Sequence, residues 1–154
     1  DADGDLTASL PVPPLTLETL NELAAAFQGE HMQVPSMVSA IKKDGVPLYK
    51  LARQGIEVER KPRLIRIYSY RFPSYTEPVA HFRVACTKGT YVRTLAHDLG
   101  QKIGCGAHLQ TLRRLASGRF DVAEALTLDK ILDLPLSELE KRVIPYLKLA
   151  GTDN

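Results

Sequence analysis

Residues 86–100 read CTKGTYVRTLAHDLG, and the spacing of apolar residues changes within this stretch. Residues 79–87, which lead into it, alternate as a strand does, and one face is formed by Ala80, Phe82, Val84 and Cys86. After Gly89 the apolar residues recur at helical spacing, at Val92, Leu95, Ala96, Leu99 and Ile103. We therefore expect a strand that turns directly into a helix, which ends at Gly104.

The helical phase places two polar-tipped side chains, Tyr91 and Arg93, in the first turn and away from the apolar stripe. A junction between a strand and a helix is a rigid support for site residues. An Arg there can bind a carboxylate or phosphate through two parallel hydrogen bonds, and a Tyr can stack on a base. The plain alternative is a surface Arg near a helix start, where the helix dipole slightly disfavours it.

The other segments give strands and helices in mixed order. We expect helices over 16–29, capped by Thr16, over 47–55, and from Thr127 to Pro135, with a last helical turn or two around 136–143. Residues 63–72 and 79–87 are predicted to form an antiparallel hairpin joined by 73–78, and residues 107–118 a further strand. Residues 30–46 are expected to be a long functional loop. These elements predict an α+β fold: a mixed, largely antiparallel sheet with flanking helices.

The composition indicates one domain with a real core, since the chain has 154 residues and is 44% hydrophobic. No run of 18 apolar residues is present, so we expect no membrane contact, and no secretory segment opens the chain. Cys86 and Cys105 are the only cysteines, which is typical of a reducing compartment. A cytoplasmic protein is therefore expected.

Charge is unevenly distributed along the chain, although the formal net charge is only +2. Residues 1–30 carry acidic residues and no Lys or Arg, whereas residues 42–71 are strongly basic. A basic middle between acidic ends is typical of a polyanion-binding surface, and an ordinary solvated surface is the equal alternative.

Other chemical motifs are weak or missing. Cys105 and His108 have the spacing of half a zinc site, but no second pair with ligand spacing follows, so we expect no metal. The sequence contains no G-x-S-x-G, no P-loop and no G-x-G-x-x-G. Taken alone, the residues indicate an α+β domain and leave open whether its basic surface binds nucleic acid or is an ordinary solvated surface.

Two long segments resemble the TruB family of bacterial tRNA pseudouridine synthases. They are QVPSMVSAIKKDGVPLYKLARQGIEVERKPR, at 33–63, and CTKGTYVRTLAHDLGQKIGCGAHLQTLRRLASGRF, at 86–120. The resemblance implies an isomerase without cofactor that flips a T-loop uridine of tRNA out of its loop. The glycosidic bond is then cut and the base is rejoined through carbon.

The resemblance also assigns roles to residues. Arg93 would pair with the catalytic aspartate, Tyr91 would line the uridine pocket, and Leu112 would pack against the flipped base. Lys42, Lys43 and Lys88 would contact the RNA of the T-arm stem-loop, with Lys42 as the leading phosphate contact. Val38 stands where the family usually has Tyr, so an aromatic role is not expected at this position.

The family's catalytic aspartate lies in a G-T-L-D-P-like segment upstream of the position that DADG occupies here. Asp129 follows Thr-Leu but begins a predicted helix, so we reject it as the nucleophile. Residues 1–145 are therefore interpreted as the C-terminal part of a pseudouridine synthase catalytic domain, and residues 146–154 as a tail. Alone, such a fragment is expected to be inactive and only marginally stable. We expect it to associate with the missing N-terminal half or with a second copy. A non-catalytic RNA-binding module on the same fold is the alternative.

Overall fold

The computed structural model describes residue 4 and residues 8–145, so the predicted tail at 146–154 lies outside the described residues. The chain divides into two compact units, residues 1–111 and residues 112–154. The first unit contains α1 (Leu17–Ala25), β1 (Gly29–Gln33), β2 (Lys42–Lys43), β3 (Val46–Pro47), α2 (Leu48–Arg53), β4 (Arg63–Thr76), β5 (Val79–Cys86) and α3 (Val92–Ile103). The second contains β6 (Ala116–Ser117), β7 (Phe120–Asp121), a 3₁₀ turn (Val122–Glu124), α4 (Leu128–Leu132) and α5 (Leu136–Arg142).

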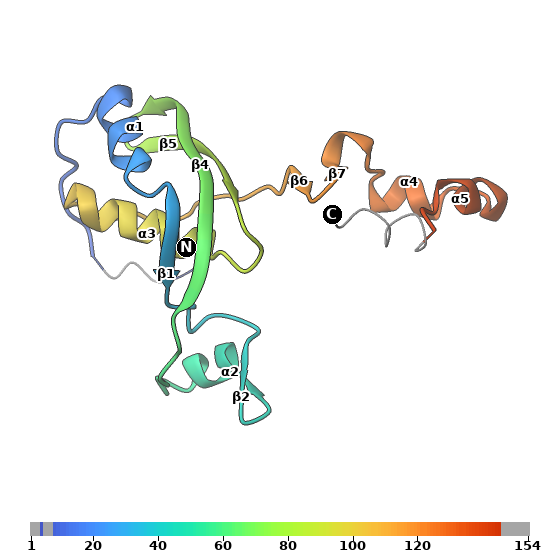
Figure 1. Cartoon of the computed structure of the whole chain (residues 1–154), viewed down its shortest axis with the longest axis horizontal. Coiled ribbons are helices and arrows are strands. Elements are labelled where there is room, and N and C mark those ends of the chain that lie inside the picture. The colour runs from blue at the N-terminus through green and yellow to red at the C-terminus, as the bar shows by residue number, and fades with distance from the viewer. Residues whose placement is uncertain (1–3, 5–7, 146–154) are drawn as a thin grey trace. The chain divides into compact units, whose positions relative to one another are not determined.

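The first unit is built around a three-stranded antiparallel sheet with the order β1-β4-β5. Helices α1 and α3 lie beside this sheet, and the small elements β2 and α2 lie beyond the end of β1 and β4 (Figure 1). The buried core joins one face of β4 to both helices, through Leu20, Ala24, Ile65, Ile67, Tyr70, Phe72, Leu95 and Leu99. The mixed, largely antiparallel α+β class predicted from the sequence is confirmed.

Two irregularities in β4 return apolar side chains to the core face farther along this strand, although Leu64 and Tyr68 of β4 are exposed. The register with β5 shifts between Ile67 and Ser69 and again between Arg71 and Ser74. Each shift adds one residue to β4, which reverses the side to which the following side chains point. Buried positions therefore change from Ile67, before the first bulge, to Tyr70, after it.

The predicted helices and the hairpin are present. Thr16 caps α1 by accepting a hydrogen bond from the backbone of Thr19, and Thr127 caps α4 in the same way through Lys130. Helix α3 ends at Gly104, whose φ of 98° is the left-handed conformation that glycine adopts without strain. On β5, the even-numbered residues from Ala80 to Cys86 face the core side, as their alternation predicted.

Three local predictions were wrong. Residues 30–46 are not one loop, because β1 and β2 lie within them; β1 points the polar His31 and Gln33 inward, which hides the strand pattern. β4 continues through 73–76, which were predicted to be the turn, because Pro73 falls at a bulge, where proline is tolerated. Residues 107–115 form no strand, and only Ala116–Ser117 pair, with β7.

The described part of the chain contains no helix long and apolar enough to cross a membrane.

Candidate functional site

Tyr91 and Arg93 lie where β5 passes into α3, as their sequence position predicted. Gly89 turns the chain there with a φ of 86°, and the Thr90 hydroxyl donates a 2.9 Å hydrogen bond to the Thr87 carbonyl oxygen. Tyr91 is the N-cap residue of α3, and Arg93 is in the first turn of that helix. Both residues are half-buried, so this junction places a phenol and a guanidinium at the start of a packed helix.

Gln33, at the end of β1, holds the backbone of Tyr91 through two hydrogen bonds. Its Oε1 accepts from the Tyr91 N–H at 2.8 Å, and its Nε2 donates to the Tyr91 carbonyl oxygen at 3.2 Å. From the sequence, Gln33 was expected to lie in the 30–46 loop, and no role was predicted for it. Its position as the first residue of the segment 33–63, which resembles the family, is the sequence feature that could have pointed to it.

The segment after β1 reaches the same site through its main chain. The Nη2 atom of Arg93 donates a 2.8 Å hydrogen bond to the Val38 carbonyl oxygen. The segment is itself attached to α2, because the Tyr49 N–H donates to the Ser39 carbonyl oxygen at 3.1 Å. The Val38 side chain is 52% exposed, so only its backbone takes part in the contact with Arg93.

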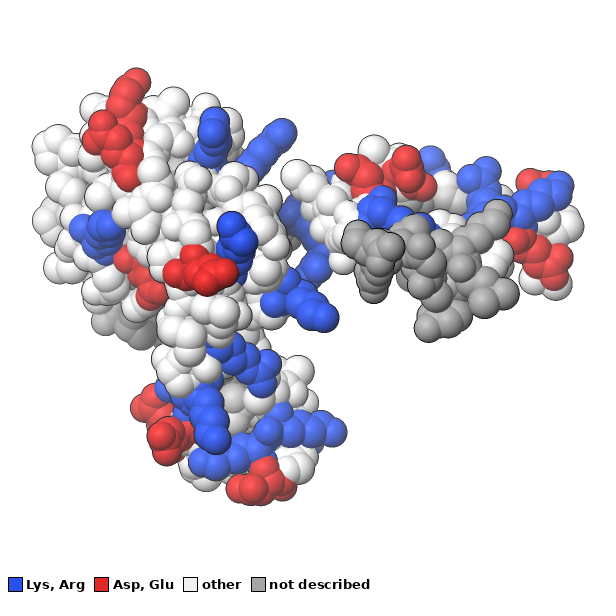
Figure 2. Space-filling view, in the orientation of Figure 1, with Lys and Arg blue, Asp and Glu red and all other residues white. Residues whose placement is uncertain are grey.

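Lysine side chains project near this segment. Lys42 and Lys43 form β2 and are exposed, and the turn after them contains Asp44 and Gly45, both with positive φ. Lys and Arg side chains gather over the part of the first unit that carries β2 and α2 (Figure 2). Lys88 is also exposed, in the turn between β5 and α3. These three lysines therefore lie on the surface, where a polyanion can reach them.

Leu112 is the first residue of the second unit, and its side chain is 61% exposed. An exposed leucine that belongs to no described helix or strand is available for an apolar contact. Leu112 belongs to the second unit, whereas Tyr91 and Arg93 belong to the first.

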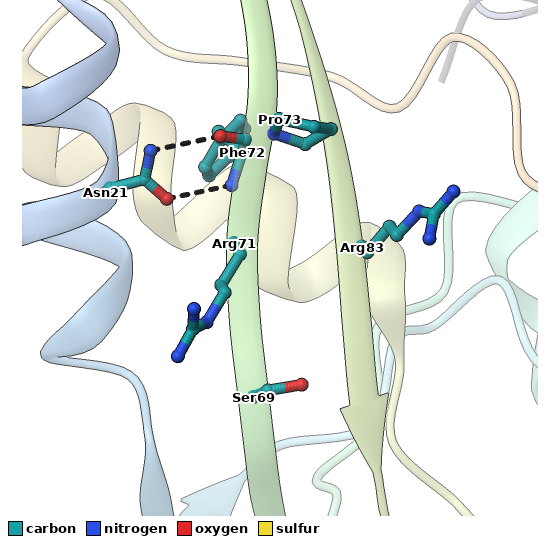
Figure 3. Close-up of a pocket in the computed structure, with 6 residues that line it drawn as sticks. All are labelled: Asn21, Ser69, Arg71, Phe72, Pro73 and Arg83. Carbon is teal, nitrogen blue, oxygen red and sulfur yellow. Dashed lines mark hydrogen bonds between the residues drawn. The ribbon is translucent and has the colours of Figure 1, made fainter.

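A cavity of about 540 Å³ lies elsewhere in the first unit, between α1, β4 and β5. Arg71 and Arg83 are cross-strand neighbours in its lining, yet Figure 3 shows their guanidinium groups pointing apart. Asn21 lies at its edge and bonds both backbone groups of Phe72. The two cations of the lining therefore do not converge on one point.

Among residue 4 and residues 8–145, no group of three or more His, Cys, Asp or Glu is placed to hold a metal ion. The Cys105 thiol instead contacts a main-chain carbonyl oxygen, that of Gly106, at 3.4 Å.

Comparison with known proteins identifies the family. Residues 1–92 match the model of the TruB family pseudouridylate synthase N-terminal domain, and residues 93–148 match that of the tRNA pseudouridylate synthase B C-terminal domain. The chain belongs to the TruB family. This confirms the family that the two long segments resemble.

Curated TruB relatives are close in sequence but longer. A tRNA pseudouridine synthase B of Opitutus terrae is 57% identical over 150 residues, which cover 97% of this chain and 62% of the relative. The corresponding protein of Syntrophotalea carbinolica is 50% identical over 131 residues, which cover 85% of this chain and 43% of the relative. The chain thus spans about two-fifths to three-fifths of the length of these two relatives.

A solved structure shares the fold of this TruB chain. It is a chain in a crystal structure of a Cbf5-Nop10-Gar1 complex, with a TM-score of 0.64 and 26% sequence identity. The match covers 90% of this chain and 37% of the other. The α+β architecture is therefore that of a known protein of more than twice the matched length.

Proposed function

We propose that this TruB chain is part of a tRNA pseudouridine synthase, an isomerase that converts a T-loop uridine to pseudouridine without cofactor or metal. The family models and the names of the curated relatives support this activity. Such an enzyme must expose the base before it can act on it, and the energy for unstacking comes from contacts with the RNA. The chain therefore needs a site for the base and a surface for the phosphates.

The observation that carries the proposal is a set of hydrogen bonds at the start of α3. Gln33 of β1 bonds the backbone of Tyr91, and Arg93 bonds the Val38 carbonyl oxygen in the segment after β1. In the proposed enzyme Arg93 pairs with the carboxylate of the catalytic aspartate and fixes its orientation. A guanidinium suits this role because two of its N–H groups match the two carboxylate oxygens. Tyr91 lines the uridine pocket beside it, and Leu112 packs against the flipped base.

Lys42, Lys43 and Lys88 supply the phosphate contacts of the proposed enzyme. All three are exposed, and the first two stand on a hairpin that is packed against α2. Phosphate contacts position an RNA without reading its sequence, whereas recognition of the loop depends on its shape and on stacking. The T-arm stem-loop of tRNA is the proposed partner.

In this proposal residues 1–145 form the C-terminal part of the catalytic domain, and residues 146–154 are a tail. The aspartate comes from an upstream segment, which makes the N-terminal half of the domain a required partner. The proposed compartment is the cytoplasm, where tRNA is modified in bacteria.

Tritium release from 5-tritiated uridine in a T-arm stem-loop tests the proposal. The chain is assayed alone, then mixed with the part of the Opitutus terrae relative that lies outside the matched 150 residues. Release only in the mixture is expected. Tight stem-loop binding with no release in either form would favour a non-catalytic RNA-binding module. Release by the chain alone would show that one of its own carboxylates is the nucleophile.

A further inference from the structure

Helix α3 begins without a cap from its own N-cap side chain. The N-cap residue is Tyr91, which makes no side-chain capping hydrogen bond. Helices usually solve this problem with Ser, Thr, Asp or Asn at this position, because the first N–H groups have no partner within the helix. The start of α3 therefore depends on groups from elsewhere in the fold.

For the N–H of Tyr91, that partner is Gln33, on a strand 58 residues upstream. In a capping box, a Glu or Gln in the first turn accepts from the N–H of the N-cap residue. Here the Gln33 carboxamide takes that place, with its Oε1 2.8 Å from the Tyr91 nitrogen. Its Nε2 bonds the Tyr91 carbonyl oxygen, which also accepts the first helical hydrogen bond, from Leu95 N–H at 3.1 Å.

These two hydrogen bonds, called the Gln33 clamp below, are rigid because Gln33 is buried. The residue is only 7% exposed, and its backbone is paired with Arg63 of β4. A buried carboxamide that meets both its donor and its acceptor partners is held in one orientation, since any other would leave polar groups unpaired. The Gln33 side chain thus fixes the N-cap residue of α3 relative to the sheet.

From these contacts we infer that Gln33 is the positioning residue for Tyr91 and Arg93. Arg93 lies in the first turn after the clamped residue, and its guanidinium also bonds Val38, in the segment that continues from Gln33. Gln33 thus orders the helix start that aims both side chains, without touching substrate itself. The expected effect of Gln33 on turnover rests on the proposed function. Its effect on the order of the helix start rests on the hydrogen bonds alone.

The fold provides a matched control in Asn21. Its carboxamide makes the same kind of two-bond clamp, on the N–H and carbonyl oxygen of Phe72 at 2.9 and 3.0 Å. That clamp joins α1 to β4, away from the start of α3. Loss of the Asn21 carboxamide also removes a third hydrogen bond, from its Nδ2 to the Leu17 carbonyl oxygen at 2.9 Å, so this control removes more bonds than the loss of Gln33 does. Only Gln33 bonds the residue that begins α3.

The variants are Gln33→Met and Asn21→Leu, which keep side-chain size and remove every hydrogen bond of the replaced carboxamide, and Gln33→Glu. Amide hydrogen exchange at Tyr91 and the Nε–H signal of Arg93 are followed by NMR in the chain itself. Two further quantities are measured separately: the turnover rate at a saturating concentration of stem-loop, and the affinity for the stem-loop. Both are measured with the chain alone or with the mixture described above, depending on which of the two releases tritium for the wild type.

In Gln33→Met we expect Tyr91 amide exchange to be about tenfold faster, because its acceptor is lost. Turnover at saturation should fall about 10- to 100-fold with unchanged stem-loop affinity, since small misplacement of a reacting group is costly. Asn21→Leu should lower thermal stability without either effect. Turnover by Gln33→Glu, relative to wild type, should recover as pH falls, because a protonated carboxyl can again donate to the Tyr91 carbonyl.

Unchanged Tyr91 exchange in Gln33→Met would overturn the inference, whatever the turnover. An equal loss of turnover in Asn21→Leu would also overturn it, since general stability would then explain both. If no form of the wild type releases tritium, the proposed function fails, and the exchange rate and the Arg93 signal still decide whether Gln33 orders the helix start.

Discussion

Arg93 and Val38, 55 positions apart in the chain, are joined by a 2.8 Å hydrogen bond from the guanidinium to a main-chain carbonyl oxygen. Because the acceptor belongs to the backbone, the contact does not depend on the side chain at position 38. The resemblance to the TruB family places Val38 where that family usually has Tyr. The bond that brings the segment after β1 to the site is therefore compatible with either residue.

Replacement of Arg93 tests whether it acts on a carboxylate or on phosphate. In Arg93→Lys the charge remains but the planar fork of donors is lost, so we expect turnover to fall by roughly 100-fold or more. Stem-loop affinity should be retained. Tritium release at saturating RNA and filter binding give the two quantities. A parallel loss of both would assign Arg93 to a phosphate contact instead.

Replacement of Lys42 and Lys43 tests the proposed RNA surface. Each phosphate contact releases counterions on binding, so Lys42→Ala and Lys43→Ala should each reduce the slope of log affinity against log salt by about 0.7 to 0.9. Affinity is measured with the stem-loop at several salt concentrations. Lys130→Ala, on α4, removes the same charge from the other unit and serves as control. An equal change of slope in the control would mean a general charge effect.

Gly100 is expected to be intolerant of any side chain. A Cβ at this position would lie 2.1 Å from the Ala107 nitrogen, because the chain after α3 returns across the helix there. The Gly106 N–H donates to the Gly100 carbonyl oxygen at 3.0 Å, which holds the two backbones together. Gly100→Ala should lower the free energy of unfolding by about 1–3 kcal/mol. Urea unfolding checks this, with the exposed neighbour Gln101→Ala as control.

Tyr70 should make the fold sensitive to high pH. Its side chain is 1% exposed and packs against Phe72 and Phe82, and this burial raises the pKa of its hydroxyl above the usual range. Above about pH 10 the unfolded chain therefore loses the Tyr70 proton while the folded chain keeps it. That proton loss favours unfolding, so the stability present below pH 10 decreases as pH rises, by up to about 1.4 kcal/mol per pH unit.

Tyr70→Phe should remove this contribution. The difference in free energy of unfolding between the variant and the wild type should be constant below about pH 10 and shift in favour of the variant above it. Unfolding by urea at a series of pH values measures both. A difference that stays constant up to pH 11 would contradict the prediction.

Local pattern was sufficient for the elements that bury an apolar stripe. The change of period after Gly89 predicted α3 and its end at Gly104, and the alternation in 79–87 predicted the inward face of β5. These predictions succeed because helical and strand spacing each place apolar side chains on one side, where the core removes them from water. The place of Tyr91 and Arg93 at the helix start follows from the same spacing.

The sequence by itself thus determined the α+β class, the helices and the junction that carries Tyr91 and Arg93. Only the tertiary structure decided that residues 29–33 pair with β4 and that this strand contains two bulges. It also decided that residues 107–115 form no strand. It also brought Gln33 and Val38 to Tyr91 and Arg93. The spacing of apolar residues indicates which side chains face the core. It does not indicate which distant residues form hydrogen bonds, because those pairs depend on how the elements pack together.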